Sequence, residues 1–186
     1  ILHSGPTITD EDIQAVTEVL KSRHLEDGVV VEQFEEKMKD LIGREYAVAT
    51  TNGFSAIHLT LIALNVKEQD EVIIPSYTCP ALLNPVLLLH AKPVFADIAT
   101  GSFNISYDTV KEKITSNTKA IIVPHTFGFP AEIEKIQSLG IPVIEDCAQS
   151  LGGRSGNKML GNFTEASIFS FYATKMITTG DGGMIL

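Results

Sequence analysis

The chain has 186 residues, of which 44% are hydrophobic and 20% are charged, as in ordinary globular proteins. Its formal net charge of −9 argues against nucleic acid or an anionic membrane surface as the main partner. The two cysteines, Cys79 and Cys147, are too few and too far apart to suggest a disulfide framework or a metal site. No apolar run is long enough to span a bilayer and no signal peptide opens the sequence, so we expect a cytoplasmic protein.

Two helices are expected in residues 1–45. The first covers about residues 9–21, where Thr9 and Asp12 form a capping pattern ahead of apolar residues at helical spacing. The second covers about residues 31–41 and stops at Gly43. We interpret both as packing elements and as candidate subunit contacts.

From Tyr46 onward, short apolar runs alternate with helical patterns. Such alternation predicts a three-layer α/β sandwich, with a mostly parallel sheet and helices on both faces. The last two strands are joined by a loop too short for a helical crossover, so the final strand should run antiparallel to its neighbour. The seven strands are expected near residues 46–49, 71–75, 93–97, 119–124, 142–146, 167–171 and 182–186.

The turn at residues 50–55, Thr-Thr-Asn-Gly-Phe-Ser, leads from the first strand into a helix that ends near Leu64. The unpaired N–H groups in the first turn of a helix form an anion site, which would involve Gly53, Phe54 and Ser55. An ordinary loop in which Ser55 is the N-cap fits the same residues. His58, among apolar residues of this helix, is interpreted as a packed histidine.

Two further strand ends carry residues of interest. The segment Ser-Tyr-Thr-Cys-Pro follows the second strand, and Pro80 suits the first turn of a helix there. Cys79 is either a neighbour of a ligand or a buried thiol. His125 ends the strand near 119–124, at the edge where ligands gather in open α/β sheets, although a structural role fits it equally well.

The strongest chemical pattern lies in the last third of the chain. Residues 142–146 form an apolar run that ends in Glu145 and Asp146, and Lys175 follows the apolar run 167–171. A lysine and a carboxylate at the ends of neighbouring strands suit pyridoxal phosphate, because a lysine amine binds the cofactor aldehyde as a Schiff base and an acid keeps the pyridine nitrogen protonated. A solvated loop lysine would give the same spacing.

The order of the segments is more specific than this spacing. The chain carries EDCAQS, then SFYATK, then TTGDGGM, and this order resembles the DegT/DnrJ/StrS family of pyridoxal-phosphate-dependent sugar aminotransferases. The resemblance extends upstream to Gly5. It implies the large domain of fold type I pyridoxal enzymes, residues 46–186 in this chain, with residues 1–45 as N-terminal helices. Because family members are about twice as long and neither end looks like a natural terminus, it also implies a C-terminal small domain absent from this sequence.

The resemblance assigns a role to each candidate residue. Lys175 would bind the cofactor and then act as the base that moves a proton. Asp146 would pair with the ring nitrogen, and Glu145 should point away because side chains alternate along a strand. The remaining cofactor contacts would be Gln149 near the ring, Cys79 on its face, and Ser170, Gly53, Phe54 and Ser55 at the phosphate. Many relatives have a small hydroxyl residue in place of Phe54, so backbone N–H groups would carry more of that contact.

The expected activity is the transfer of an amino group, from glutamate, onto a keto sugar that is most often nucleotide-linked, by a homodimer. A pyridoxal-dependent sugar dehydratase is one alternative, but such relatives usually carry a histidine in place of Lys175. A non-catalytic protein that keeps the fold is the other alternative. A dehydrogenase of the Rossmann type is excluded, since no G-x-G-x-x-G follows the first strand.

Overall fold

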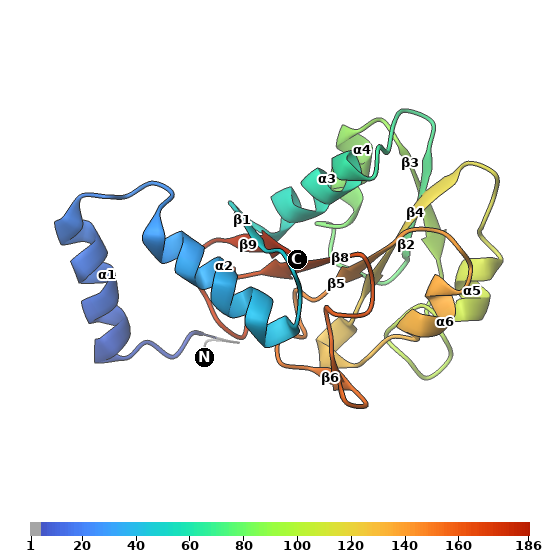
Figure 1. Ribbon diagram of the computed structural model, residues 1–186. Coiled ribbons are helices and arrows are strands. Elements are labelled where there is room, and N and C mark those ends of the chain that lie inside the picture. The colour runs from blue at the N-terminus through green and yellow to red at the C-terminus, as the bar shows by residue number, and fades with distance from the viewer. Residues whose placement is uncertain (1–4) are drawn as a thin grey trace.

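A seven-stranded sheet runs through the centre of the computed structural model, which describes residues 5–186 (Figure 1). The strand order is β1-β9-β8-β5-β4-β2-β3. The pairs from β8 to β3 are parallel, whereas β9 is antiparallel to both β8 and β1. The predicted sheet and its antiparallel last strand are therefore confirmed. The bounds are Val48–Thr50 (β1), Glu71–Pro75 (β2), Lys92–Ala96 (β3), Thr118–Pro124 (β4), Val143–Asp146 (β5), Ala166–Ser170 (β8) and Gly183–Ile185 (β9).

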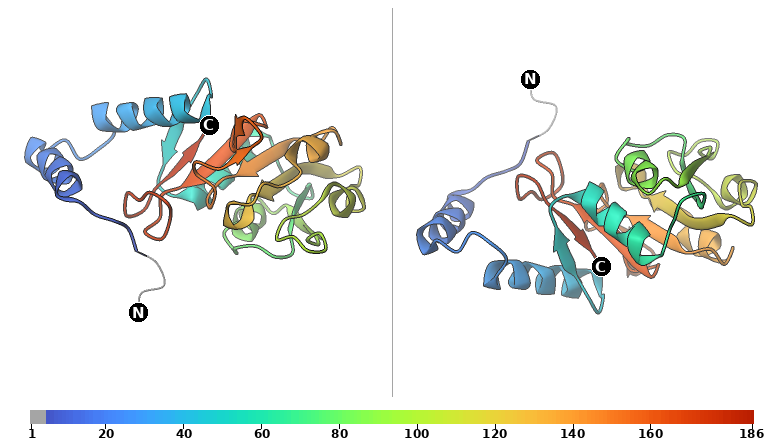
Figure 2. Two further views of the ribbon diagram at one scale, coloured as in Figure 1. Left: turned by 90° about the horizontal axis from the view of Figure 1, so that it is seen from below. Right: turned by 90° about the horizontal axis from the view of Figure 1, so that it is seen from above.

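Helices cover both faces of this sheet, which makes the three layers predicted from the sequence (Figures 1 and 2). A short hairpin of two strands lies between β5 and β8. The helices are α1 (Asp10–Ser22), α2 (Val29–Ile42), α3 (Gly53–Ala63), α4 (Leu83–Leu88), α5 (Tyr107–Lys111) and α6 (Ile133–Gln137), with a 3-10 turn η1 (Thr126–Gly128); the hairpin consists of β6 (Arg154–Ser155) and β7 (Lys158–Met159).

Side-chain alternation divides the core into two sides. On β4, Ala120 and Ile122 face α3 and α4, whereas Ile121 and Val123 face α5 and α6. Phe169 of β8 and Phe171, which directly follows this strand, join Met38 and Ile42 of α2 on the second side. Burial on both faces explains why these strands read as continuous apolar runs in the sequence.

The helix α1 stands away from the sheet in both figures (Figures 1 and 2). Its N-terminus has the predicted capping box, in which Thr9 and Asp12 exchange hydrogen bonds. None of its residues is buried, and its apolar stripe of Ile13, Val16 and Leu20 is exposed. Within the described residues, α2 packs on the sheet and α1 does not.

Two local expectations are corrected. Asn52, and not Ser55, caps α3: its Oδ1 accepts a hydrogen bond from the Ser55 N–H at 2.8 Å. The helix α4 begins at Leu83 and not at Pro80, which belongs to the turn before it. Pro85 falls in the first turn of α4, where a missing N–H costs little.

No helix between residues 5 and 186 combines the length and the apolar character that crossing a bilayer would need.

Candidate active site

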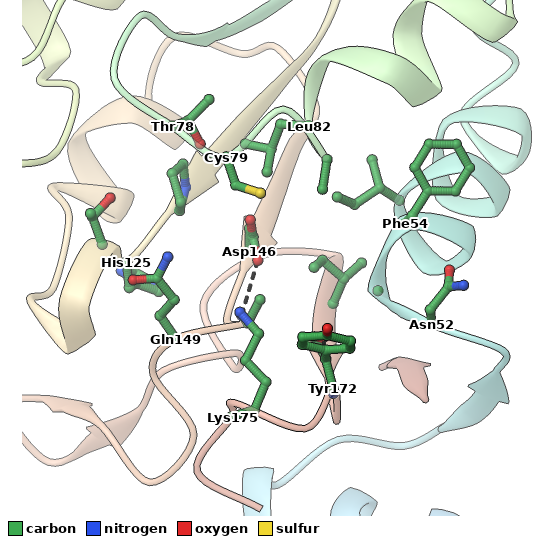
Figure 3. Close-up of a pocket in the computed structure, with 18 of the residues that line it drawn as sticks. Asn52, Phe54, Thr78, Cys79, Leu82, His125, Asp146, Gln149, Tyr172 and Lys175 are labelled. Atoms are coloured by element: carbon green, nitrogen blue, oxygen red, sulfur yellow. Dashed lines mark hydrogen bonds between the residues drawn. The ribbon is translucent and has the colours of Figure 1, made fainter. Parts of the chain in front are cut away.

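A cavity of about 500 Å³ opens where β2, β4, β5 and β8 end and α3 begins. Parallel strands bring their carboxyl ends to one edge of the sheet, so segments as far apart in the sequence as Asn52 and Asp181 meet here. The close-up in Figure 3 looks into this cavity. Seven of the eight predicted site residues line it: Gly53, Phe54, Cys79, Asp146, Gln149, Ser170 and Lys175.

Lys175 and Asp146 face each other across the cavity. Figure 3 shows the lysine side chain reaching from the loop after β8 toward Asp146 at the end of β5. The base of that loop is fixed, because Thr178 Oγ1 and the Thr179 N–H both donate to the Phe171 carbonyl. The lysine is half-buried and therefore accessible from the cavity.

Asp146 is buried and poorly paired. Its Oδ1 accepts a hydrogen bond from the Ala148 N–H at 2.9 Å. Burial raises the pKa of Asp146 above its ordinary value of 3.8, and this outweighs the opposing effects of the Ala148 N–H and of the charge of Lys175. A cation placed beside this carboxyl group would lower its pKa again, so the site is suited to a positively charged ligand group.

Glu145, the neighbour of Asp146, lies on the other face of β5. It has no exposed surface and is bound to His125, Gly161 and Phe163 behind the sheet. The predicted division of the two carboxylates between opposite faces is therefore confirmed.

The N-terminus of α3 forms another wall of the cavity. The N–H groups of Gly53 and Phe54 find no acceptor among residues 5–186, as expected for the first turn of a helix. A Cβ at Gly53 would lie 3.0 Å from the Ser170 Cβ, and one at Gly183 would lie 2.3 Å from the Asn52 carbonyl carbon. The two glycines thus let the helix start approach β8 and β9, which brings free N–H groups and the Ser170 hydroxyl to one place.

Ser55 is the exception among the predicted residues. It does not line this cavity but a separate surface hollow with His58, and its Oγ pairs with Thr51 Oγ1 at 2.9 Å. The physical reason is the helical rotation of about 100° per residue. With Asn52 as N-cap, Gly53 and Phe54 face the cavity, and Ser55 is carried round to the outside.

The remaining walls include residues that the sequence left ambiguous. Cys79 is exposed into the cavity, so the ligand-neighbour interpretation is favoured over a buried thiol. Gln149 Oε1 accepts the N–H of Phe127 at 3.0 Å, and Phe127 adopts a φ of 55° that is strained for a residue other than glycine. His125 has both roles considered: it lines the cavity and is fixed by two ring hydrogen bonds.

Phe127, Tyr172 and Asp181 are among the lining residues that were not predicted. Tyr172 directly follows the last core residue of the β8 segment, and Asp181 lies in the glycine-rich turn before β9. Both positions could have been found from their places at strand ends. The position of Phe127 depends on its unusual backbone conformation and had no signal in the sequence.

The cavity fits pyridoxal phosphate by the chemistry of its groups. It offers an amine for the aldehyde, a buried carboxyl group with little pairing for the ring nitrogen, and free N–H groups at a helix start for the phosphate.

Comparison with known proteins identifies a family for nearly the whole chain. A profile described as the DegT/DnrJ/EryC1/StrS aminotransferase family matches residues 6–186. GDP-perosamine synthase of Escherichia coli O157:H7 is 37% identical over 186 residues, which covers 97% of this chain and 51% of the relative.

Two solved structures have the same fold. An aminotransferase from Psychrobacter cryohalolentis superposes with a TM-score of 0.95 at 32% identity, covering 100% of this chain and 49% of its own. The GDP-4-keto-6-deoxy-D-mannose-3-dehydratase of E. coli, described with bound hydrated PLP, gives a TM-score of 0.92 at 30% identity, covering 98% and 50%. The chain thus spans about half the length of the relatives it matches.

Proposed function

The chain belongs to the DegT/DnrJ/EryC1/StrS aminotransferase family, and from this premise we propose that the protein is a pyridoxal-phosphate-dependent sugar aminotransferase. One observation carries the proposal: Lys175 and Asp146 face the same cavity, and the free N–H groups of α3 form another of its walls. These are the groups that the aldehyde, ring nitrogen and phosphate of the cofactor require.

Each side chain has a definite task in this proposal. Lys175 Nζ would hold the cofactor covalently and, once released by the incoming amine, would move a proton at the substrate carbon. Asp146 would keep the ring nitrogen protonated, which in turn would lower its own pKa. The bound cofactor would supply a ring that accepts electrons from the substrate carbon.

The other cavity residues would orient the cofactor. The N–H groups of Gly53 and Phe54 and the Ser170 hydroxyl would bind the phosphate. Cys79 would contact a face of the ring through its sulfur. Gln149, whose Oε1 already accepts the Phe127 N–H, would use its amide N–H groups near the ring.

We propose that the amino acceptor is a keto sugar linked to a nucleotide, because one relative is a GDP-perosamine synthase. Glutamate as the amino donor, a homodimer and a cytoplasmic location follow from the family resemblance alone and are part of the same proposal. A C-terminal domain that completes the pocket is proposed on the ground that the relatives are about twice as long.

A sugar dehydratase is the second candidate, since a dehydratase is among the structures with this fold. Lys175 favours the aminotransferase, because such dehydratases usually carry a histidine at this position, whereas a lysine can hold the cofactor as a Schiff base. Incubation with a nucleotide-linked keto sugar and glutamate separates the two: an amino sugar supports the transferase, and a deoxygenated keto sugar supports the dehydratase.

The direct test is covalent capture of the cofactor. The protein is incubated with pyridoxal phosphate and reduced with borohydride, and its mass and peptide map are measured. We expect one adduct, on the peptide that contains Lys175. The Lys175→Arg variant keeps the charge and should lose the adduct. The control Lys158→Ala removes an exposed lysine outside the cavity, whose Nζ lies over the Phe163 ring, and should keep the adduct.

An adduct that persists in Lys175→Arg, or one that maps to another lysine, would refute the assignment of Lys175. If the wild-type protein forms no adduct, this chain does not hold the cofactor, and the non-catalytic alternative is supported.

A further inference from the structure

The carboxylate of Glu145 is fully enclosed behind the sheet. Its Oε1 is 2.9 Å from His125 Nε2 and also accepts the Gly161 N–H at 2.5 Å, while Oε2 accepts the Phe163 N–H at 3.0 Å. Neither Glu145 nor the His125 side chain has exposed surface. The carboxylate is therefore saturated with protein donors and takes no direct part in the cavity.

The ring of His125 is held in a single protonation state by its two partners. Nδ1 accepts a hydrogen bond from the Ala131 N–H at 3.0 Å, so this nitrogen carries no proton. The proton must then be on Nε2, which faces the Glu145 carboxylate. The geometry thus defines a neutral histidine with the proton on Nε2.

His125 links this buried carboxylate to the cavity. The residue forms part of the cavity wall beside Asp146 and Gln149, with its ring buried inside that wall (Figure 3). Its backbone N–H donates to the Asp146 carbonyl, and its carbonyl accepts the Gly128 N–H, both at 3.1 Å. The strained Phe127 lies between His125 and Gly128, so the shape of this wall depends on where His125 is held.

We propose that Glu145 is a positioning residue for the cavity, which fixes His125 in its neutral Nε2–H form and thereby holds the wall from His125 to Gly128 in place. The geometry alone carries the statement about His125. The consequence for cofactor binding rests on the proposed function.

A cation site is the competing interpretation of this cluster. His125, Glu145 and Cys147 bring possible ligand atoms within 4.8 Å of one another. However, both Glu145 oxygens and both ring nitrogens already have protein hydrogen-bond partners. Burial also raises the pKa of Cys147 well above its ordinary value of 9.0, so its sulfur stays protonated. These observations favour the hydrogen-bonding role.

The Glu145→Gln variant tests the role with little change in shape. If the amide oxygen stays at His125, the amide N–H₂ group faces the Phe163 N–H, and two donors meet. If the amide is flipped, it faces Nε2–H, and the ring can restore a hydrogen bond only by moving its proton to Nδ1 and losing Ala131. Either arrangement disturbs the network, because an amide cannot replace a group that only accepts.

The matched control is Glu71→Gln. Glu71 is also a buried glutamate on a strand, bound by Lys92 and Thr115, but it lies at the start of β2, away from the cavity. Both variants lose a buried carboxylate. A structural loss alone would affect them alike, whereas a positioning role predicts a change at His125 in Glu145→Gln only.

The measurement is nitrogen-15 NMR of the assigned histidine rings in the 186-residue protein, with pyridoxal phosphate affinity followed by absorbance. We expect wild-type His125 to be protonated on Nε2 alone, and Glu145→Gln to shift its ring signals and weaken cofactor binding about tenfold, as for one lost buried hydrogen bond. Glu71→Gln should keep the wild-type ring signals and affinity.

A wild-type His125 protonated on Nδ1 or on both nitrogens would overturn the proposal, and this result does not depend on whether a variant folds. Unchanged ring signals in a folded Glu145→Gln protein would overturn it too. Failure of every protein to bind cofactor, with the expected ring signals present, would count against the proposed function and leave the role of Glu145 in positioning His125 standing.

Discussion

The two faces of β5 give adjacent carboxylates opposite surroundings. Behind the sheet, Glu145 is fully buried and accepts hydrogen bonds from a histidine and two backbone N–H groups. On the cavity side, Asp146 has the Ala148 N–H and the charge of Lys175 beside an open space. A polar group whose hydrogen bonds are satisfied within the protein stabilises the fold, whereas a poorly paired one remains free to bind a ligand.

The largest effect on stability should come from removing the carboxylate of Glu145, on the side of β5 that faces away from the cavity. Glu145→Ala leaves several buried donors without an acceptor. It is expected to lower the free energy of unfolding by about 3–5 kcal/mol, as for other broken buried pairs. Asp146→Ala removes one acceptor and a desolvated carboxyl group, so its effect should stay within about 1 kcal/mol. Urea unfolding of both variants measures the difference. Equal losses would mean that the two faces do not differ in this way.

A smaller effect concerns pH. Because the pKa of Asp146 is raised in the folded state, the folded protein holds this proton to higher pH than the unfolded chain does. Stability contributed by this group should therefore fall as pH rises from the ordinary value of 3.8 to the folded-state pKa. Asp146→Asn removes the titration and should be the more stable protein at neutral pH in the absence of cofactor.

The check is the urea midpoint of wild type and Asp146→Asn across this pH range, since their difference cancels the other titrating groups. A wild-type protein that gains stability relative to the variant as pH rises would show that the carboxylate is well paired after all.

The smallest effect concerns the rates at which the two cysteines react, and it involves no change in stability. Cys79 is exposed at the cavity, whereas Cys147 is buried on the Glu145 side and has a raised pKa. An alkylating reagent should therefore label Cys79 first, and pyridoxal phosphate should slow that labelling. Mass spectrometry of the labelled peptides measures both rates. If the rate of Cys79 labelling is the same with and without bound cofactor, Cys79 does not contact the cofactor.

Much of the fold was predictable because its signals are local. Apolar runs and helical spacing located the strands and helices within a few residues, and the Thr9 capping box began α1 as expected. The placement of Asp146 and Glu145 on opposite faces followed from strand alternation alone. The carboxyl ends of parallel strands share one edge, so the meeting of Asp146 and Lys175 was also predictable.

Other features depended on contacts between distant segments. The orientation of Ser55 follows from which residue caps α3: the sequence analysis considered Ser55 for this role, whereas the structure has Asn52 in it. The left-handed conformation of Phe127 depends on Gln149, 22 residues away. The saturation of Glu145 depends on loop N–H groups from Gly161 and Phe163.

The sequence by itself determined the order of elements, the layered sheet and the face on which each strand residue lies, because these depend on periodicity within a few residues. Only the tertiary structure decided which polar groups are paired and which are left free at the cavity. Pairing depends on distances and angles between groups that are far apart in the chain, and no local pattern encodes them.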